Sequence, residues 1–190
     1  MTTIAFINGK GGSGKTTLTV LVAASLAEAG HQVTIADTDP QETATRWLAE
    51  REMGPIKLAA KGKEGFTLID TPPILNSAAV AAAIQSARLV LLVSSPSPAD
   101  LFTAADTAAL IKKLGAESKA RLVFNNVQEG TRLGNKLDFM AEKVGLPALK
   151  STVRRRQAYQ HAVWLGWPSL PLEARHEIQA LTLEAVGMLL

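Results

Sequence analysis

A glycine-rich segment near the start of the chain constrains the fold more than any other feature. Residues 9–17 read GKGGSGKTT and satisfy the pattern G-x-x-x-x-G-K-[ST]. An apolar run, Ile4–Ile7, precedes the segment, and an apolar helical stretch, Leu18–Ala29, follows it. Glycines let such a loop wrap closely enough for successive N–H groups to point inward and bind an anion. We therefore expect a strand, a phosphate loop and a helix that together hold a nucleoside triphosphate.

Individual residues of this loop have expected roles. The helix that begins at Gly14 directs the positive end of its dipole at the phosphates. Lys15 is expected to reach the β- and γ-phosphates, and the Thr16 hydroxyl is placed to ligate Mg²⁺. The residues expected to contact the nucleotide are Gly11, Gly12, Ser13, Gly14, Lys15, Thr16 and Thr17. A glycine-rich turn can match the pattern by chance, so the acidic sites downstream matter to the assignment.

Two further apolar runs end in carboxylates. Asp37 ends the run Val33–Asp37, with Asp39 following it, and Asp70 ends the run Phe66–Asp70. Ligands in open α/β sheets bind at the carboxyl ends of strands, so these carboxylates can face the γ-phosphate and Mg²⁺. Asp70 is expected to hold Mg²⁺, usually through water. The alternative for Asp39 is that it begins a turn and caps the helix expected after it.

The order of elements predicts the fold class. Strands are expected to alternate with helices through the chain. Further strands are expected at 89–93 and 122–126, and a short strand or extended segment over 148–153. Helices are expected over 131–144 and, at the end of the chain, over 172–190. Repeated βαβ units with short links predict a three-layer α/β P-loop NTPase fold, with a mostly parallel, twisted sheet flanked by helices. A length of 190 residues predicts one domain, residues 1–190. Absence of cysteine excludes disulfides and thiolate metal sites.

Lys10 is an unusual feature, because an ordinary phosphate loop needs no lysine so early. The segment KGGSGKTT at 10–17 resembles the deviant Walker A box of the ParA/MinD ATPases. The segments DTDPQ at 37–41 and DTPP at 70–73 resemble the two switch segments of that family, and SSPSP at 94–98 resembles its ParF-type branch. A solvated lysine with no specific partner is the alternative for Lys10.

The resemblance implies a set of roles. ATP and Mg²⁺ would be the cofactors, and Lys10 would act in trans on the ATP of a second subunit. Asp39 would orient the attacking water, while Asp37 would support the metal region. The strand at 122–126 ends in two asparagines, and Asn126 is a candidate to contact adenine because an amide carries a donor and an acceptor side by side. Asparagines at strand ends are also common turn formers.

Charge is concentrated in one segment. Residues 121–160 carry 8 basic and 3 acidic side chains, whereas residues 1–120 carry 11 of each. A localised basic surface is expected for a polyanion partner, and the resemblance implies non-specific DNA binding. The candidates for contact with DNA are Lys150, Arg154, Arg155 and Arg156, with Arg132, Lys136 and Lys143 also in the segment. The alternative is a solvated face, or one paired with acidic side chains.

The function implied is that of a small partition ATPase. It would form an ATP-dependent sandwich homodimer, with possible further assembly into a polymer, and bind DNA without sequence preference. Hydrolysis would be slow until stimulated by a centromere-binding adaptor protein, which would supply specific DNA recognition. Residues 177–190 contain no Lys or Arg, so the basic membrane helix of MinD-type members is not expected. The location expected is cytoplasmic and nucleoid-associated.

Two alternative functions stay open at this stage. The first is a related ATPase that positions a protein cargo, such as a chemotaxis cluster or a microcompartment, on the nucleoid. The second is a metabolic ATP-dependent ligase or kinase on a related fold, which would need its own catalytic groups beside the γ-phosphate. His31, His161 and His176 are scattered and show no such group.

Overall fold

One parallel sheet forms the centre of the molecule. The computed structural model describes residues 1–50, 56–58, 64–131 and 133–189. Six strands lie in the order β3-β2-β4-β1-β5-β6, and every recorded pairing is parallel. Their bounds are β1 (Thr2–Ile7), β2 (Val33–Asp37), β3 (Ile56–Leu58), β4 (Phe66–Asp70), β5 (Leu89–Ser94) and β6 (Ala120–Phe124).

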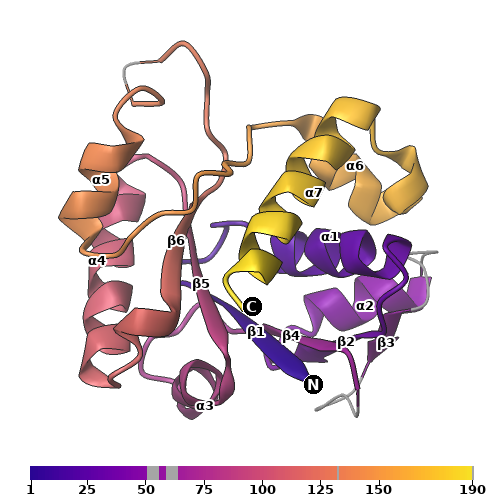
Figure 1. Cartoon of the computed structure of the whole chain (residues 1–190), viewed down its shortest axis with the longest axis horizontal. Coiled ribbons are helices and arrows are strands. Elements are labelled where there is room, and N and C mark those ends of the chain that lie inside the picture. Colours follow the sequence, from indigo (N-terminus) through magenta and orange to yellow (C-terminus); the bar gives the residue numbers. More distant parts are fainter. Residues whose placement is uncertain (51–55, 59–63, 132, 190) are drawn as a thin grey trace.

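Helices cover both faces of this sheet, as Figure 1 shows. The longer helices are α1 (Lys15–Glu28), α2 (Thr43–Glu50), α3 (Ala78–Ser86), α4 (Pro98–Lys113), α5 (Leu137–Val144), α6 (Gln157–Leu165) and α7 (Leu172–Gly187). Side chains of α1, α2, α6 and α7 join one buried cluster, and those of α3, α4 and α5 join another. The predicted three-layer α/β fold is confirmed.

Strand β1 is buried because the two layers pack on opposite sides of it. Successive side chains of a strand point to opposite faces, so an apolar run without alternation suits a strand covered on both. Ile4 and Phe6 join the cluster under α1, whereas Ala5 and Ile7 join the cluster under α3 and α4. All four residues have no exposed surface. The strand that leads into the phosphate loop is therefore rigidly held.

The strand order brings the predicted site together. Strand β1 lies between β4 and β5, so the loop that follows it is flanked by the ends of both. Asp70 is in register with Phe6 on one side and with Asp37 on the other. Within the described residues, no helix has the combination of length and apolar character needed to cross a membrane.

The C-terminal third differs from expectation in one element. The helix expected over 131–144 begins only at Leu137. The Thr131 hydroxyl accepts the Gly134 N–H at 3.1 Å and donates to the Gln128 carbonyl at 2.7 Å, so a local turn replaces the first helical turns. The segment expected to be extended after 148 runs along the edge of β6, with Leu149 and Val153 donating to Leu122 and Phe124.

Candidate functional site

The phosphate loop joins the end of β1 to the start of α1 and depends on two of its glycines. Gly14 has φ 95°, and a Cβ there would overlap the amide nitrogen of Asn125. A Cβ on Gly9 would lie 2.5 Å from Leu75, which follows the segment DTPP. Gly14 needs glycine for its backbone conformation and for the close approach of Asn125, whereas Gly9 needs it only for the close approach of Leu75. The loop is therefore packed between the β6 end and the segment after β4.

Two polar groups buried in this loop fit an anion. The Lys15 side chain is almost fully buried, and its ammonium donates to the Lys10 carbonyl at 3.2 Å. Burial lowers the pKa of Lys15, while the charges of Asp70 and Asp39 act in the opposite direction. The Ser13 hydroxyl is also buried and has no hydrogen-bond partner within the described residues. Buried polar groups are normally satisfied, so a phosphate bound here would supply the missing acceptor.

Asp70 and Thr16 form the part of the site that fits a cation. The Thr16 hydroxyl donates to Asp70 Oδ2 at 2.7 Å, and the Thr19 hydroxyl lies 3.4 Å from Oδ1. Asp70 has no exposed surface, and burial raises its pKa to about 7 although the Thr16 hydrogen bond acts to lower it. A buried carboxylate beside a hydroxyl is a donor set that Mg²⁺ accepts, with phosphate and water completing its shell. In the part of the chain that is described, no three His, Asp or Glu side chains form a metal site on their own.

Asp37 and Asp39 have distinct local partners. Asp37 Oδ2 accepts the Thr45 N–H at 2.9 Å and the Thr45 hydroxyl at 3.1 Å, while Oδ1 accepts the Asp39 N–H at 3.1 Å. Asp39 Oδ1 accepts the Gln41 N–H at 2.9 Å, which makes a turn. Asp37 therefore contacts the first turn of α2. The Asp39 carboxylate accepts fewer hydrogen bonds than the Asp37 carboxylate. Both charges contribute to the raised pKa of Asp70.

Lys10 is more exposed than Lys15 and has different partners. Its ammonium forms an ion pair with Asp100 in the first turn of α4, and its N–H donates to Asn8 Oδ1 at 2.9 Å. The Asp100 carboxylate also accepts the Ser95 hydroxyl. Burial acts to raise the pKa of Asp100, but the hydrogen bonds from Lys10 and Ser95 outweigh it and hold the pKa below its usual value.

Sequence reasoning missed Asp100. Ser97 caps α4 and accepts the Asp100 N–H at 3.3 Å, and Pro98 is the first helical residue. An acidic residue three positions after such a cap is common for local reasons. The sequence therefore gives no reason to connect Asp100 with a lysine 90 positions earlier.

The two asparagines after β6 have different environments. Asn125 is buried, and its Nδ2 donates to the Ser13 carbonyl at 2.8 Å. Asn126, the candidate for contact with adenine, is exposed and has φ 55°. Of the pair, Asn125 is the one that touches the phosphate loop.

The basic segment is partly neutralised by α7. Arg154 pairs with Glu129 at 2.5 Å and with Glu177 at 3.5 Å, and Arg156 pairs with Glu177 at 3.2 Å. The Arg155 side chain is exposed and has no acidic partner within the described residues. The other exposed candidate is Lys150, whose N–H donates to Glu184 at 2.7 Å. Arg132 lies outside the described residues.

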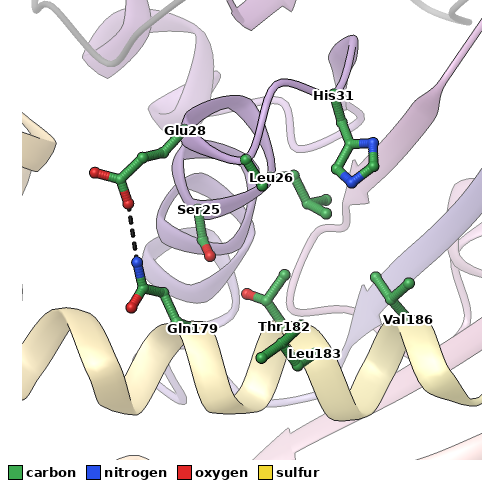
Figure 2. Close-up of a pocket in the computed structure, with 9 residues that line it drawn as sticks. Ser25, Leu26, Glu28, His31, Gln179, Thr182, Leu183 and Val186 are labelled. Atoms are coloured by element: carbon green, nitrogen blue, oxygen red, sulfur yellow. Dashed lines mark hydrogen bonds between the residues drawn. The ribbon is translucent and has the colours of Figure 1, made fainter.

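A separate cavity lies far along α1 from the phosphate loop. Figure 2 shows this cavity between the last turns of α1 and the C-terminal half of α7. Its volume is about 510 Å³. Gln179 donates to Glu28 at 3.0 Å beside it. The cavity is lined by Ser25, Leu26, Glu28, Ala29, His31, Gln179, Thr182, Leu183 and Val186. The predicted site residues lie elsewhere, because α1 meets the phosphate loop at its other end.

Comparison with known protein families finds a match over most of the chain. Residues 4–164 match the CobQ/CobB/MinD/ParA nucleotide binding domain. Maintenance of carboxysome distribution protein A of Halothiobacillus neapolitanus (strain ATCC 23641 / c2) is 30% identical over 192 residues, which cover 91% of this chain and 88% of that protein. The protein of the same name from Gloeobacter kilaueensis is 32% identical over 193 residues, covering 93% and 88%.

A solved structure shares the fold. The structure of a Cyanothece McdA variant in complex with ATP superposes with a TM-score of 0.77 at 16% identity, covering 98% of this chain and 96% of that one. At this identity the likeness concerns the fold alone.

Proposed function

Because the chain belongs to the CobQ/CobB/MinD/ParA family of nucleotide-binding domains, we propose that it is an ATP-driven dimerisation switch that positions a protein cargo along DNA. The chain is an ATPase of this family. The observation that carries the proposal is the separation of the two loop lysines. The Lys15 side chain is buried, whereas the Lys10 side chain is partly exposed and forms an ion pair with Asp100.

The nucleotide is held by the chain's own loop. Lys15 and the Ser13 hydroxyl contact phosphate oxygens, with the N–H groups of Gly11, Gly12 and Gly14 around them. Thr16 and Asp70 hold Mg²⁺, and Thr17 completes the contact set at the start of α1. When bound, Mg²⁺ neutralises charge on the β- and γ-phosphates. Support for this assignment comes from the buried cation, the unpartnered hydroxyl and the buried carboxylate beside Thr16.

Lys10 links two subunits by contacting the nucleotide of the second one. Lys15 already serves the chain's own triphosphate, so a second lysine on the outer side of the loop is available to the nucleotide of another copy. The ion pair with Asp100 must break when Lys10 makes that contact. ATP loading and dimerisation are thereby linked, since the partner's triphosphate replaces Asp100 as the anion that Lys10 binds.

Hydrolysis rests on the carboxylates that follow β2. Asp39 orients the attacking water, and Asp37 holds the backbone around it through its contacts with Asp39 and Thr45. In the single chain the Asp39 carboxylate is engaged with Gln41. A partner protein that reorders this turn would raise the rate, which gives slow hydrolysis in isolation and stimulation by an adaptor.

The cargo assignment follows the relatives that share most of the chain. Two of them are named for maintenance of carboxysome distribution, at 30% and 32% identity over about nine-tenths of this sequence. We therefore place the positioning of a protein cargo ahead of DNA partition, which the sequence motifs alone favoured. The cargo is distributed along DNA that the protein binds without sequence preference. The exposed side chains of Lys150 and Arg155 are candidates to contact the phosphates of this DNA.

The proposal is tested by deleting the gene in its host. The spacing of protein assemblies is followed by fluorescence microscopy, and plasmid retention is followed by plating without selection. Cargo positioning predicts clustered or unevenly spaced assemblies with unchanged plasmid retention. Loss of plasmids with normally spaced assemblies would support partition instead. Complementation by the wild-type chain, but not by the Lys15→Ala variant, ties either outcome to ATP.

A further inference from the structure

We infer that Asn125 is a positioning residue that holds the phosphate loop in its anion-binding conformation. The residue directly follows β6 and is buried, with 6% of its surface exposed. Its Nδ2 donates to the carbonyl of Ser13 at 2.8 Å, across 112 positions of sequence. This contact connects the end of the edge strand β6 directly to the centre of the phosphate loop. The inference rests on the proposed nucleotide site.

The hydrogen bond fixes the orientation of one peptide. No described peptide bond is cis, so the Ser13 carbonyl and the Gly14 N–H point in opposite directions. With the carbonyl of Ser13 turned toward Asn125, the N–H of Gly14 is turned away from it, toward the other side of the peptide. An anion-binding loop needs its N–H groups to share one side. Asn125 therefore selects the peptide orientation that the phosphate requires.

The packing against Gly14 shows how closely the two residues are matched. A Cβ on Gly14 would overlap the Asn125 amide nitrogen, and Gly14 adopts φ 95°, which favours glycine. Asn125 is itself anchored, because its N–H donates to the Ser94 carbonyl at 2.9 Å. Since β5 and β6 are paired, the amide is held by a rigid part of the sheet.

The neighbouring asparagine provides a matched control. Asn126 is exposed and has φ 55°, a left-handed conformation that Asn and Asp both tolerate. Asn125→Asp and Asn126→Asp introduce the same charge at adjacent positions with almost unchanged volume. Only Asn125→Asp removes the donor that faces Ser13 and sets a carboxylate against its carbonyl.

Inorganic tripolyphosphate distinguishes a loop-positioning role from contact with the base. The affinities of the full-length chain for tripolyphosphate, ATP and GTP are each measured by isothermal titration calorimetry in the presence of Mg²⁺. Loss of one buried hydrogen bond predicts about 3- to 10-fold weaker binding of tripolyphosphate and of ATP by Asn125→Asp. The affinity of Asn126→Asp for tripolyphosphate should stay within about 2-fold of the wild-type value. This change is smaller than the loss expected for one buried hydrogen bond.

Asn125→Ala is the second variant, because it removes the donor without adding charge. It should also weaken tripolyphosphate binding, and its circular dichroism spectrum without ligand should match the wild type. Unchanged tripolyphosphate affinity in both Asn125 variants, with a loss confined to ATP, would overturn the inference and assign Asn125 to the base. The nucleotide site itself fails only if the wild type binds neither ATP nor tripolyphosphate.

Discussion

Lys10 and Asp100 form an ion pair that connects the phosphate loop to the first turn of α4. The Asp100 side chain is 14% exposed, whereas that of Lys10 is 43% exposed. Lys10 is therefore neither an unpaired surface lysine nor a buried one like Lys15. In the single chain its cation has an intramolecular partner, which another anion must replace before Lys10 can act on a second subunit.

Replacing Asp100 by Asn should favour the dimer. The substitution keeps the shape and the capping contact with Ser97 but removes the charge that holds Lys10. A partly exposed ion pair is worth about 1 kcal/mol or less, and each of the two subunits breaks one, so we expect dimerisation with Mg²⁺ and a non-hydrolysable ATP analogue to tighten by up to about 30-fold. Sedimentation velocity measures the dimer constant. Asp106→Asn, on the exposed side of the same helix, is the control. A weaker dimer would show that Asp100 supports the interface instead.

Lys15→Ala should remove most of the affinity for ATP. The ammonium is buried and its recorded hydrogen bond is to a carbonyl, so the phosphate is its main charged partner in this account. Hydrogen bonds to charged groups are worth about 1.5–3 kcal/mol, which predicts a loss of about 10- to 150-fold or more. Fluorescence titration with a labelled ATP analogue measures the change. Retained affinity would contradict the phosphate-loop assignment.

The free protein should lose stability as the pH rises toward 8. Asp70 has an ordinary pKa of 3.8, and burial raises it to about 7 in the folded chain. Because the folded-state pKa is the higher one, the favourable contribution of protonated Asp70 is complete below pH 3.8 and lost as the pH passes 7. The difference is of the order of 4 kcal/mol.

Asp70→Asn tests this assignment in buffer with EDTA and without nucleotide. Between pH 5 and 8, chemical denaturation of the variant should show a flatter dependence on pH than that of the wild type. The amide is neutral throughout and can still accept from Thr16. Parallel curves for the two proteins would mean that Asp70 is already ionised at pH 5.

Arg155 should matter to DNA more than its two neighbours. Arg155→Ala should weaken binding to unrelated DNA sequences about equally and reduce the slope of log affinity against log salt by about 1. Arg154→Ala and Arg156→Ala should act mainly on stability, because each removes a cation from the nearly buried Glu177. Filter binding at several salt concentrations and thermal melts separate the two effects. Equal losses of DNA affinity in all three variants would contradict a role of Arg155 in DNA binding that is separate from the role of Arg154 and Arg156 in stability.

Local sequence patterns predicted the fold well because each strand and helix is specified by its own residues. The apolar run of β1 and the carboxylates that end β2 and β4 predicted a site at one edge of a parallel sheet, and the strand order places the ends of these strands side by side. The helix over 131–144 was too long by its first turns. The Thr131 side chain bonds to Gly134 and Gln128, a local competition that apolar periodicity does not show.

Contacts between distant segments could not be predicted in the same way. The basic segment was interpreted as unbalanced because no acidic run lies near it in sequence, yet α7 brings Glu177 to Arg154 and Arg156. Asn125 and Asp100 were missed for the same reason, since each reaches the phosphate loop from about 90 or more positions away. These pairings depend on which helix ends and strand ends become neighbours, and only the folded chain defines them.

The oligomeric state of Lys10→Ala with nucleotide shows most directly whether Lys10 acts between subunits. The full-length variant and the wild type are compared by sedimentation velocity with Mg²⁺ and a non-hydrolysable ATP analogue, after titration has shown that both bind it. We predict that the wild type sediments as a dimer and that Lys10→Ala binds the analogue as a monomer. A dimer of normal stability in the variant would contradict the role of Lys10 between subunits.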